Sequence, residues 1–215
     1  MKVLIACEES GTVTRAFRKL GYDAWSCDTM ATSGGLPEYH IQGDVLEILN
    51  NGWDLMIAHP PCTYLANSSV QHLKHDGSKY KNKNPNILYG IPRWEAMYEG
   101  AMFFNKLKNA PIKRIAIENP IPHKFAVGYI GIYSQIIQPY HFGHMEQKAT
   151  CLWLKGLPKL KHTNNVYKEM MLLDKKERQK NHWTSPGKDR GKIRSKTYSG
   201  IAEAIAIQYG DLDKF

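Results

Sequence analysis

The sequence predicts a three-layer α/β fold with a mostly parallel sheet. Short apolar runs with strand character alternate along the chain with amphipathic stretches whose apolar residues recur at helical spacing. Such an alternation is typical of a parallel sheet that is covered by helices on both faces. Polar residues directly follow several of the apolar runs, and open α/β sheets bind ligands at the carboxyl ends of their strands. We therefore expect a functional site along that edge.

The expected elements follow one another in a regular order. Lys2–Ala6 is the first strand, and residues 12–20 form an amphipathic helix that ends before Gly21. The later elements are expected at residues 23–27 (strand), just before Gly43 (short strand), 45–50 (helical turn), 54–58 (strand), 92–108 (helix), 113–117, 135–138 and 151–154 (strands), and 200–209 (terminal helix). A long loop with few apolar residues, 66–91, follows the fourth strand, and loops of this length are functional or disordered.

Length and composition indicate one globular domain with a sizeable core, since the chain has 215 residues and 42% of them are hydrophobic. The apolar runs are far shorter than the ~20 residues of a membrane helix. Met1 leads directly into a strand and not into a cleavable signal. We therefore expect no membrane association and a cytoplasmic location.

Cysteine and histidine usage argues against disulfides and metals. The four cysteines show no CxxC spacing and suit reduced thiols. Among the nine histidines, His141 and His144 have i, i+3 spacing, but Pro139 and Gly143 disfavour a helix there and no cysteine pair accompanies them. No metal site is predicted.

Positive charge is concentrated in one segment near the carboxyl terminus. The formal net charge is +9, and residues 175–196 hold nine Lys or Arg against two acidic residues, a local charge of +7. A basic run of this kind favours a polyanionic partner such as nucleic acid. A solvated basic tail without a partner is the alternative, and composition does not separate the two.

A cysteine stands where the strand at residues 54–58 ends. The segment reads WDLMIAHPPCTYL, so the strand runs into His59, two prolines and then Cys62. Consecutive prolines restrict φ and remove two backbone donors, which ends the strand and holds the next side chain in a defined direction. Cys62 is therefore predicted to be a positioned thiol.

A positioned thiol and a carboxyl group together suit alkylation of cytosine at C5. That carbon is a poor nucleophile until a thiolate adds to C6. The addition also needs an acid or hydrogen-bond donor at N3, a natural task for a carboxyl group with a raised pKa. Glu118 follows a strand expected to lie beside the one that carries Cys62, and it is the candidate for this task.

Two tripeptides at these places resemble motifs of the DNA cytosine-5 methyltransferase superfamily, and more closely of short bacteriophage members that lack a full target-recognition domain. PPC at residues 60–62 is similar to the nucleophile motif, and ENP at residues 118–120 is similar to the ENV motif with proline for valine. The resemblance implies a Rossmann-like class I methyltransferase fold with a long loop after the nucleophile. It also implies that Cys62 attacks C6 and that Glu118 contacts N3.

The same resemblance implies S-adenosyl-L-methionine as cofactor. It places the cofactor over the carboxyl ends of the first strands and against the last motif, YSGIAEA at residues 198–204. The CEESG loop has a single glycine where the family has FxGxG. By the same resemblance, Asp28 stands where the family binds the ribose hydroxyls of the cofactor, and Asp44 stands where it binds the adenine. The implied cofactor-binding residues are Cys7, Glu8, Glu9, Ser10, Gly11, Asp28, Asp44, Pro60, Ser199 and Gly200.

Substrate binding is assigned mainly to the basic segment. Residues 147–150 echo the QxRxR motif without its arginines, and the stretch between Cys151 and the last motif is about 45 residues, too short for a large recognition domain. The expected division is a catalytic core at 1–160, a basic substrate-binding segment at 161–197 and a terminal helix at 198–215 that packs back on the core. The expected substrate-binding residues are Asn119, Lys148, Lys188, Arg190, Lys192, Arg194 and Lys196.

The sequence thus predicts a cytosine-5 methyltransferase that binds and methylates DNA through a covalent cysteine adduct, in the host cytoplasm if a phage encodes it. A second hypothesis is transfer to single-stranded nucleic acid, RNA or a free pyrimidine nucleotide, since a full recognition domain is missing. A third is a catalytically inactive nucleic-acid-binding or decoy protein of the same fold. Cofactor binding discriminates the third from the others.

Overall fold

A seven-stranded sheet forms the centre of the molecule, seen in a computed structural model that describes residues 1–74, 87–185 and 190–211, apart from the side chains of Lys192 and Ile193. The strand order is β3-β2-β1-β4-β5-β7-β6. Only β7 runs antiparallel to its neighbours β5 and β6. The strands are β1 (Lys2–Ala6), β2 (Asp23–Asp28), β3 (His40–Gln42), β4 (Leu55–Ala58), β5 (Arg114–Pro120), β6 (Gln135–Ile137) and β7 (Thr150–Lys155). The sheet confirms the predicted Rossmann-like class I methyltransferase fold.

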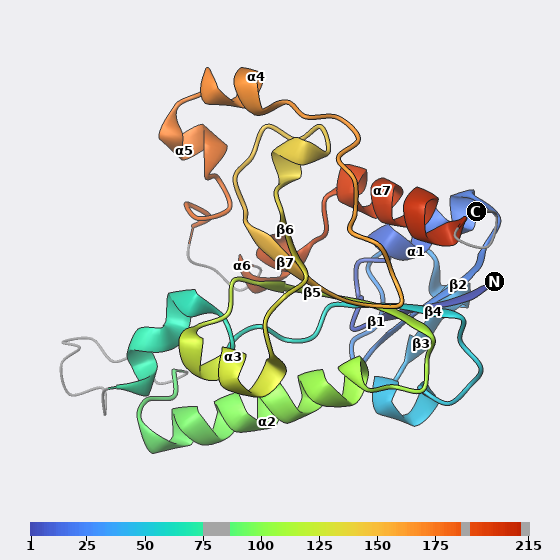
Figure 1. Ribbon diagram of the computed structural model, residues 1–215, viewed down its shortest axis with the longest axis horizontal. Coiled ribbons are helices and arrows are strands. Elements are labelled where there is room, and N and C mark those ends of the chain that lie inside the picture. The colour runs from blue at the N-terminus through green and yellow to red at the C-terminus, as the bar shows by residue number, and fades with distance from the viewer. Residues whose placement is uncertain (75–86, 186–189, 212–215) are drawn as a thin grey trace.

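Helices cover both faces of the sheet and give the three layers (Figure 1). On one face α1 (Thr12–Lys19) and α7 (Ser199–Gly210) pack on the side chains of Val3 and Ile5 in β1. On the other face α2 (Ile91–Lys108) and α3 (Lys124–Ile130) share a core with Leu4 and Ala6. Since β1 is buried on both faces, it reads as a continuous apolar run.

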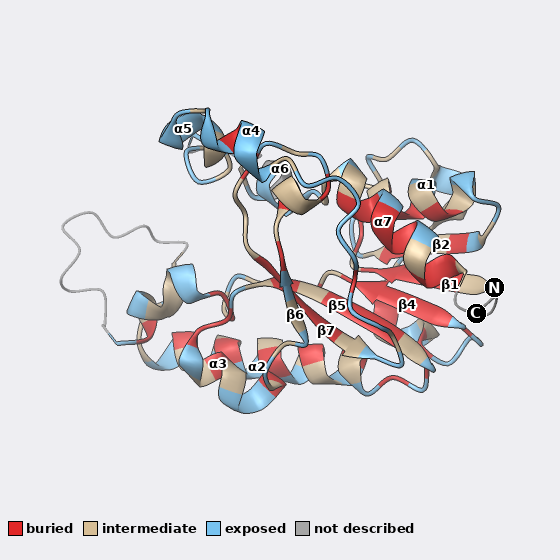
Figure 2. Cartoon of the chain, turned by 45° about the horizontal axis from the view of Figure 1, so that its top comes forward, coloured by how far each residue is buried: buried red, intermediate tan, exposed pale blue. Residues whose placement is uncertain are grey.

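Short helices fill the connections. The 3₁₀ helices are η1 (Pro37–Tyr39), η2 (Val45–Ile48), η3 (Asn67–Leu73) and η4 (Pro139–His141), and the short α-helices are α4 (Tyr167–Met171), α5 (Lys175–Arg178) and α6 (Arg190–Ser195). Helices α4 and α5 stand apart from the sheet and are largely exposed, whereas the central strands are buried (Figure 2). The described part of the chain contains no helix with both the length and the apolar character needed to cross a membrane.

Several elements differ from the sequence-based expectation. Strand β5 continues through Glu118 to Pro120 because β7 pairs with it over that whole length. The expected long loop begins with η3, whereas residues 75–86 of that loop lie outside the described part. Helix α3 was not expected, because its sequence KFAVGYI lacks a clear helical period. The ring of His123 caps it by accepting a hydrogen bond from the backbone N–H of Ala126 at 3.0 Å.

The turn after β1 is held by a buried carboxylate. Glu8 accepts hydrogen bonds from the backbone N–H of Val13 at 2.6 Å and of Thr14 at 3.2 Å, and from the Thr14 hydroxyl at 2.6 Å. These groups lie in the first turn of α1, where backbone donors lack partners within the helix and a negative charge is favoured. Glu8 thus joins the first strand to the first helix.

We expect Glu8→Ala to lower the free energy of unfolding by about 2–3 kcal/mol, because buried N–H groups would lose a charged acceptor. Urea unfolding followed by circular dichroism measures this. Glu47→Ala is the control, since Glu47 is an exposed acid in the first turn of the 3₁₀ helix η2. Equal, small effects of both substitutions would contradict the capping role of Glu8.

Candidate active site

The thiol predicted to be the nucleophile lies at the carboxyl edge of the sheet. Strand β4 ends at Ala58, and the two prolines carry the chain to Cys62, whose side chain is partly buried. The Asn119 side-chain amide on β5 donates a hydrogen bond to the Pro60 carbonyl at 2.9 Å and fastens this turn to the neighbouring strand. Asn119 is almost fully buried. Its observed contact is therefore with the turn that carries the cysteine.

The strand register brings His59 and Glu118 together. Ala58 of β4 pairs with Ile117 of β5, so the residues that follow them are neighbours. His59 Nδ1 lies 3.0 Å from Glu118 Oε2, and the two side chains are only 11% and 18% exposed. Sequence reasoning gave His59 no defined role. The signal that could have identified it is a polar residue at the end of a buried strand, next to the strand that ends in Glu118.

Each side chain of the pair stabilises the charged form of the other. Burial works against the charge of His59, but the hydrogen bond and negative charge of Glu118, with a further effect of Glu8, raise the pKa of the imidazole. Burial would raise the pKa of Glu118, but the hydrogen bond and positive charge of His59, together with Lys148 and Thr150, lower it. The expectation that Glu118 has a raised pKa is wrong, because it was made without a cationic partner.

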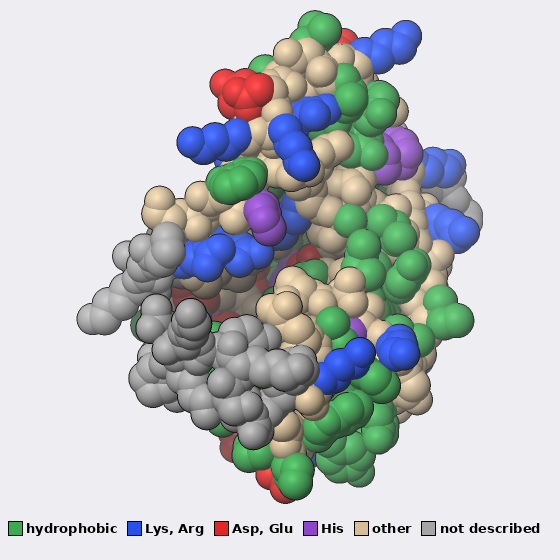
Figure 3. Space-filling model, turned by 90° about the vertical axis from the view of Figure 1, so that its left-hand side faces the viewer, with side chains coloured by type: hydrophobic (Ala, Val, Ile, Leu, Met, Phe, Trp, Pro, Cys, Tyr) green, Lys and Arg blue, Asp and Glu red, His purple; other side chains and the backbone are tan. Residues whose placement is uncertain are grey.

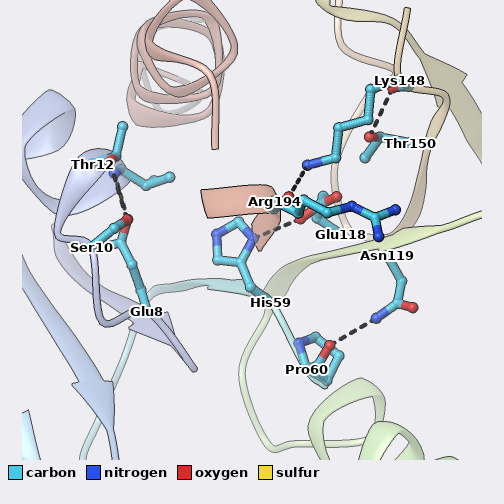
Figure 4. A network of polar contacts seen from close by, with 11 residues as sticks. Glu8, Ser10, Thr12, His59, Pro60, Glu118, Asn119, Lys148, Thr150 and Arg194 are labelled. Atoms are coloured by element: carbon cyan, nitrogen blue, oxygen red, sulfur yellow. Dashed lines mark hydrogen bonds and ion pairs between the residues drawn. The ribbon is translucent and has the colours of Figure 1, made fainter. Parts of the chain in front are cut away.

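Lys148 and Arg194 extend over this pair from other parts of the chain (Figure 4). Lys148 precedes β7 and donates from Nζ to the Arg194 carbonyl at 2.6 Å, which ties α6 to the core. Burial and the charge of Glu118 raise the pKa of the Cys62 thiol, whereas the charges of Lys148 and Arg194 oppose that rise. The two basic side chains therefore favour the thiolate.

Replacing Arg194 by glutamine is expected to raise the pKa of Cys62 further, because the positive charge of this guanidinium opposes the rise caused by burial and by Glu118. The effect should be small, since solvent screens the exposed side chain. The pH dependence of iodoacetamide alkylation, followed on the Cys62 peptide by mass spectrometry, measures the pKa. Lys196→Gln is the matched control, since Lys196 is an exposed cation only two residues further along the chain. Equal shifts in both variants would contradict a specific role of Arg194.

The other cysteines provide a contrast. Burial, followed by nearby acidic groups, raises the pKa of Cys7 to about 12, of Cys27 to about 11 and of Cys151 to about 12. Neutral thiols are poor nucleophiles. Cys62 is the cysteine whose neighbours include basic side chains.

The expected cofactor residues gather at the ends of β1, β2 and β3. Asp28 ends β2, Asp44 follows β3, and the charges of both reach Cys7 after β1. One oxygen of each aspartate holds its own loop, with Oδ1 of Asp28 accepting from the Met30 N–H and Oδ1 of Asp44 from the Leu46 N–H, each at 2.9 Å. The second oxygen of each carries no hydrogen bond within the described part of the chain.

This donor set fits S-adenosyl-L-methionine. Carboxylates accept hydrogen bonds from ribose hydroxyls and from an adenine amino group, and a negatively charged edge suits a sulfonium cation. Cys7 adopts a left-handed backbone with φ of 58°, a conformation that favours glycine and occurs here at a strand end where the backbone turns sharply. Glu8 also lies at this edge, but its carboxylate is turned toward α1, so its backbone is the part that could face a cofactor.

A second loop supports the CEESG turn. Gly34 lies so close that an added Cβ would be 2.4 Å from the Ser10 carbonyl. The Ser33 N–H and the Thr32 hydroxyl donate to the Glu9 carbonyl at 3.1 and 2.9 Å. The CEESG turn is therefore approached closely by Gly34 of another loop, and Gly11 at its end has φ of 61°.

The amino-terminal end of α7 reaches the same region. Ser199 is exposed there, and the Gly200 N–H donates to His144 Nε2 at 3.0 Å. A Cβ on Gly200 would lie 2.1 Å from the Phe142 carbonyl, so this position needs glycine for close packing. In Figure 4 the Ser10 to Thr12 loop lies on one side of His59, with Glu118 and Lys148 on the other.

Glu146 anchors the basic segment to the core. Its nearly buried carboxylate accepts from the Tyr198 hydroxyl at 2.8 Å and from the Asn181 amide at 3.3 Å, and it pairs with Lys180 Nζ at 2.8 Å. Tyr198 is the residue before α7, so one carboxylate holds both the basic segment and the terminal helix.

The basic segment borders a hollow surface. Figure 3 shows the face at the left of Figure 1, with Lys and Arg side chains gathered above a hollow. Arg190 is partly buried and Lys196 is exposed, whereas Lys188 and the side chain of Lys192 lie outside the described residues. Trp183 is 54% exposed within the same segment. Among the described residues, no three His, Cys, Asp or Glu side chains are grouped as metal ligands.

Comparisons with known proteins agree in fold. No protein-family profile and no curated protein matches the sequence. Solved structures that match include a DNA modification methyltransferase encoded within an E. coli prophage, with 14% identity, coverage of 82% of this chain and 49% of that chain, and a TM-score of 0.44. A second is a mutant of Spodoptera frugiperda DNMT2, with 12% identity, coverage of 77% of this chain and 54% of that chain, and a TM-score of 0.40. A third is the S. pombe Dnmt2 methyltransferase, with 12% identity, coverage of 81% of this chain and 54% of that chain, and a TM-score of 0.43.

These matches are DNA cytosine-5 methyltransferase-like proteins, the class that the sequence motifs resemble. The chain spans about half the length of each. Identities of 12–14% carry no information on substrate, so the reaction is inferred from the site residues.

Proposed function

We propose that this protein is a methyltransferase that uses S-adenosyl-L-methionine to methylate C5 of cytosine in DNA through a covalent adduct with Cys62. The observation that carries the proposal is the junction of β4 and β5. There a thiol with basic neighbours and a partly buried carboxylate are held by adjacent strands, next to an edge lined by acidic residues. Such convergence of a nucleophile, a proton-transfer group and a cofactor edge suits group transfer to a ring carbon.

In the proposed reaction Cys62 adds as a thiolate to C6 of a flipped cytosine, forming an S–C6 bond. Lys148 and Arg194 stabilise the thiolate before attack. Glu118 faces N3 and, when protonated, donates there as negative charge develops on the ring. C5 then becomes nucleophilic. After methylation solvent water accepts the proton from C5, the S–C6 bond breaks and Cys62 leaves as a thiolate.

Asp28 and Asp44 would hold the cofactor through its ribose hydroxyls and adenine, with Pro60 and the CEESG turn beside it. The cofactor supplies an electrophilic methyl group. Ser199 and Gly200 at the start of α7 would close this side of the site. Contacts with the DNA backbone are assigned to Arg190, Arg194 and Lys196, with Lys188 and Lys192 from the same segment.

The test is direct detection of product. Purified protein is incubated with methyl-labelled cofactor and cytosine-containing duplex DNA, and the digested DNA is analysed by mass spectrometry. Labelled 5-methylcytosine is expected. Absence of any labelled pyrimidine, with cofactor binding established by a raised melting temperature, would contradict the proposal and favour the non-catalytic binding role.

Single-stranded nucleic acid is the second candidate substrate. The exposed Trp183 lies among Lys and Arg residues, an arrangement that can stack on an unpaired base while cations contact phosphates. The basic substrate-binding segment at 161–197, with three small helices among its described residues, also offers little surface for reading a duplex. Parallel reactions with duplex DNA, single-stranded DNA, RNA and free deoxycytidine monophosphate separate these substrates.

A further inference from the structure

His59 is a buried histidine next to the nucleophile that the proposed reaction leaves without a task. Its Nδ1 is occupied by Glu118 at 3.0 Å. Its Nε2 is buried and has no hydrogen-bond partner within the described part of the chain. A buried polar nitrogen without a partner is unfavourable for stability, since it loses solvent without gaining a bond. Packing alone therefore gives no reason for a histidine at this position.

The charged groups around His59 come from several elements. Glu118 on β5 is in direct contact, and Glu8 in the turn after β1 adds a second negative charge. Lys148, which precedes β7, opposes them. Cys62 follows on the next turn of the chain, and the charge of Glu118 reaches it, as does that of Arg194 on α6. The net effect of these neighbours is to raise the pKa of the imidazole.

We propose that His59 stores the proton that Glu118 donates to N3 of the cytosine, so that the two side chains work as one proton-sharing pair. The proposal rests on the proposed function. His59 is then a positioning residue that acts through Glu118, and its place at the β4–β5 junction follows from the register.

The proton that is given to N3 and returned needs no other reactant. In the resting pair, imidazolium and carboxylate have a net charge of zero. The Nδ1–H bond breaks and an Oε2–H bond forms, which leaves neutral imidazole beside a carboxylic acid, again with a net charge of zero. The acid then gives its proton to N3 as the thiolate adds to C6, and N3 returns it when the thiol leaves.

Sharing the proton widens the pH range in which the site is active. The pair keeps its proton until the pH rises through the raised pKa of His59. A carboxyl group alone would lose the proton at a lower pH, even with burial raising its pKa. His59→Asn is the sharpest variant, because the asparagine amide can still donate to Glu118 but carries no titrating proton.

The first experiment does not depend on turnover. ¹⁵N-histidine NMR follows the titration of His59 in the wild-type protein and in Glu118→Gln. We expect a titration midpoint above 6.5 in the wild type, the ordinary value for histidine, and a lower one in the variant, since burial would then act unopposed by Glu118. Equal titration midpoints of His59 in the two proteins would overturn the proposal that His59 and Glu118 share a proton.

The second experiment compares methyl transfer to cytosine-containing DNA by wild type and His59→Asn from pH 6 to 9. Dividing the wild-type rate by the His59→Asn rate at each pH largely cancels the effect of Cys62 ionisation, which both proteins share. We expect an unchanged melting temperature and similar rates at low pH. The ratio of the wild-type rate to the variant rate should then grow by up to about tenfold per pH unit, between the pH at which Glu118 loses its proton in the variant and the titration midpoint of His59 in the wild type. His162→Gln, which alters an exposed histidine, should give a constant ratio near one.

A constant wild-type to His59→Asn ratio at every pH would overturn the proposal, because a merely structural role lowers the rate uniformly. Absence of methylated product from wild type would instead overturn the proposed function, and with it donation to N3. The NMR comparison would still decide whether the pair shares a proton.

Discussion

Cys62→Ala is expected to lower the rate of methyl transfer by at least about 10⁴-fold, because no other group in the site can form the bond to C6. Methylated cytosine is quantified by mass spectrometry over a fixed time with saturating cofactor. Cofactor affinity should change little, since most residues assigned to the cofactor lie at the ends of β1, β2 and β3 or at the start of α7. Removing one partly buried sulfur should alter stability by only about 1 kcal/mol.

Thr63→Ala is the matched control for this experiment. Thr63 is the next residue and is exposed, so its substitution disturbs the same turn without removing the thiol. It should retain activity within a few-fold. Substantial methylation by Cys62→Ala would contradict covalent catalysis, whatever the effect of the control.

Glu118→Gln is expected to lower the rate by about 10²–10⁴-fold, the usual contribution of general acid catalysis. The amide cannot supply a proton to N3. It also removes the carboxylate in contact with His59, so the imidazole loses the main cause of its raised pKa. Single-turnover rates at saturating DNA and cofactor measure the loss in the chemical step.

Glu38→Gln serves as the control, because Glu38 is an exposed acid on η1 and should have no effect. A Glu118→Gln protein that binds DNA poorly but reacts at the normal rate once saturated would contradict the assigned role. That outcome would make Glu118 a binding residue.

The sequence predicted the sheet well for a physical reason. The central strands are buried on both faces, so each reads as a short continuous apolar run, as in Lys2–Ala6 and Leu55–Ala58. The position of Cys62 was also predictable, since two prolines after such a run leave few directions for the next side chain.

The partners of that thiol could not be predicted in the same way. The contact of His59 with Glu118 depends on the register of β4 against β5, which involves residues 59 positions apart. The approach of Lys148 and Arg194 depends on how loops and short helices pack after the sheet has formed. Local sequence patterns contain neither kind of information, and for this reason the pKa of Glu118 was predicted in the wrong direction.

Trapping of the covalent adduct tests the central claim most directly. Cytosine-containing DNA in which the target base is 5-fluorocytosine is incubated with protein and cofactor. Fluorine at C5 cannot leave as a proton does, so the S–C6 bond should persist. We predict a covalent protein–DNA adduct. After digestion, the peptide that contains Cys62 should carry a methylated fluoropyrimidine on its sulfur. A folded, cofactor-binding protein that forms no adduct on DNA for which it yields 5-methylcytosine would contradict the proposed mechanism.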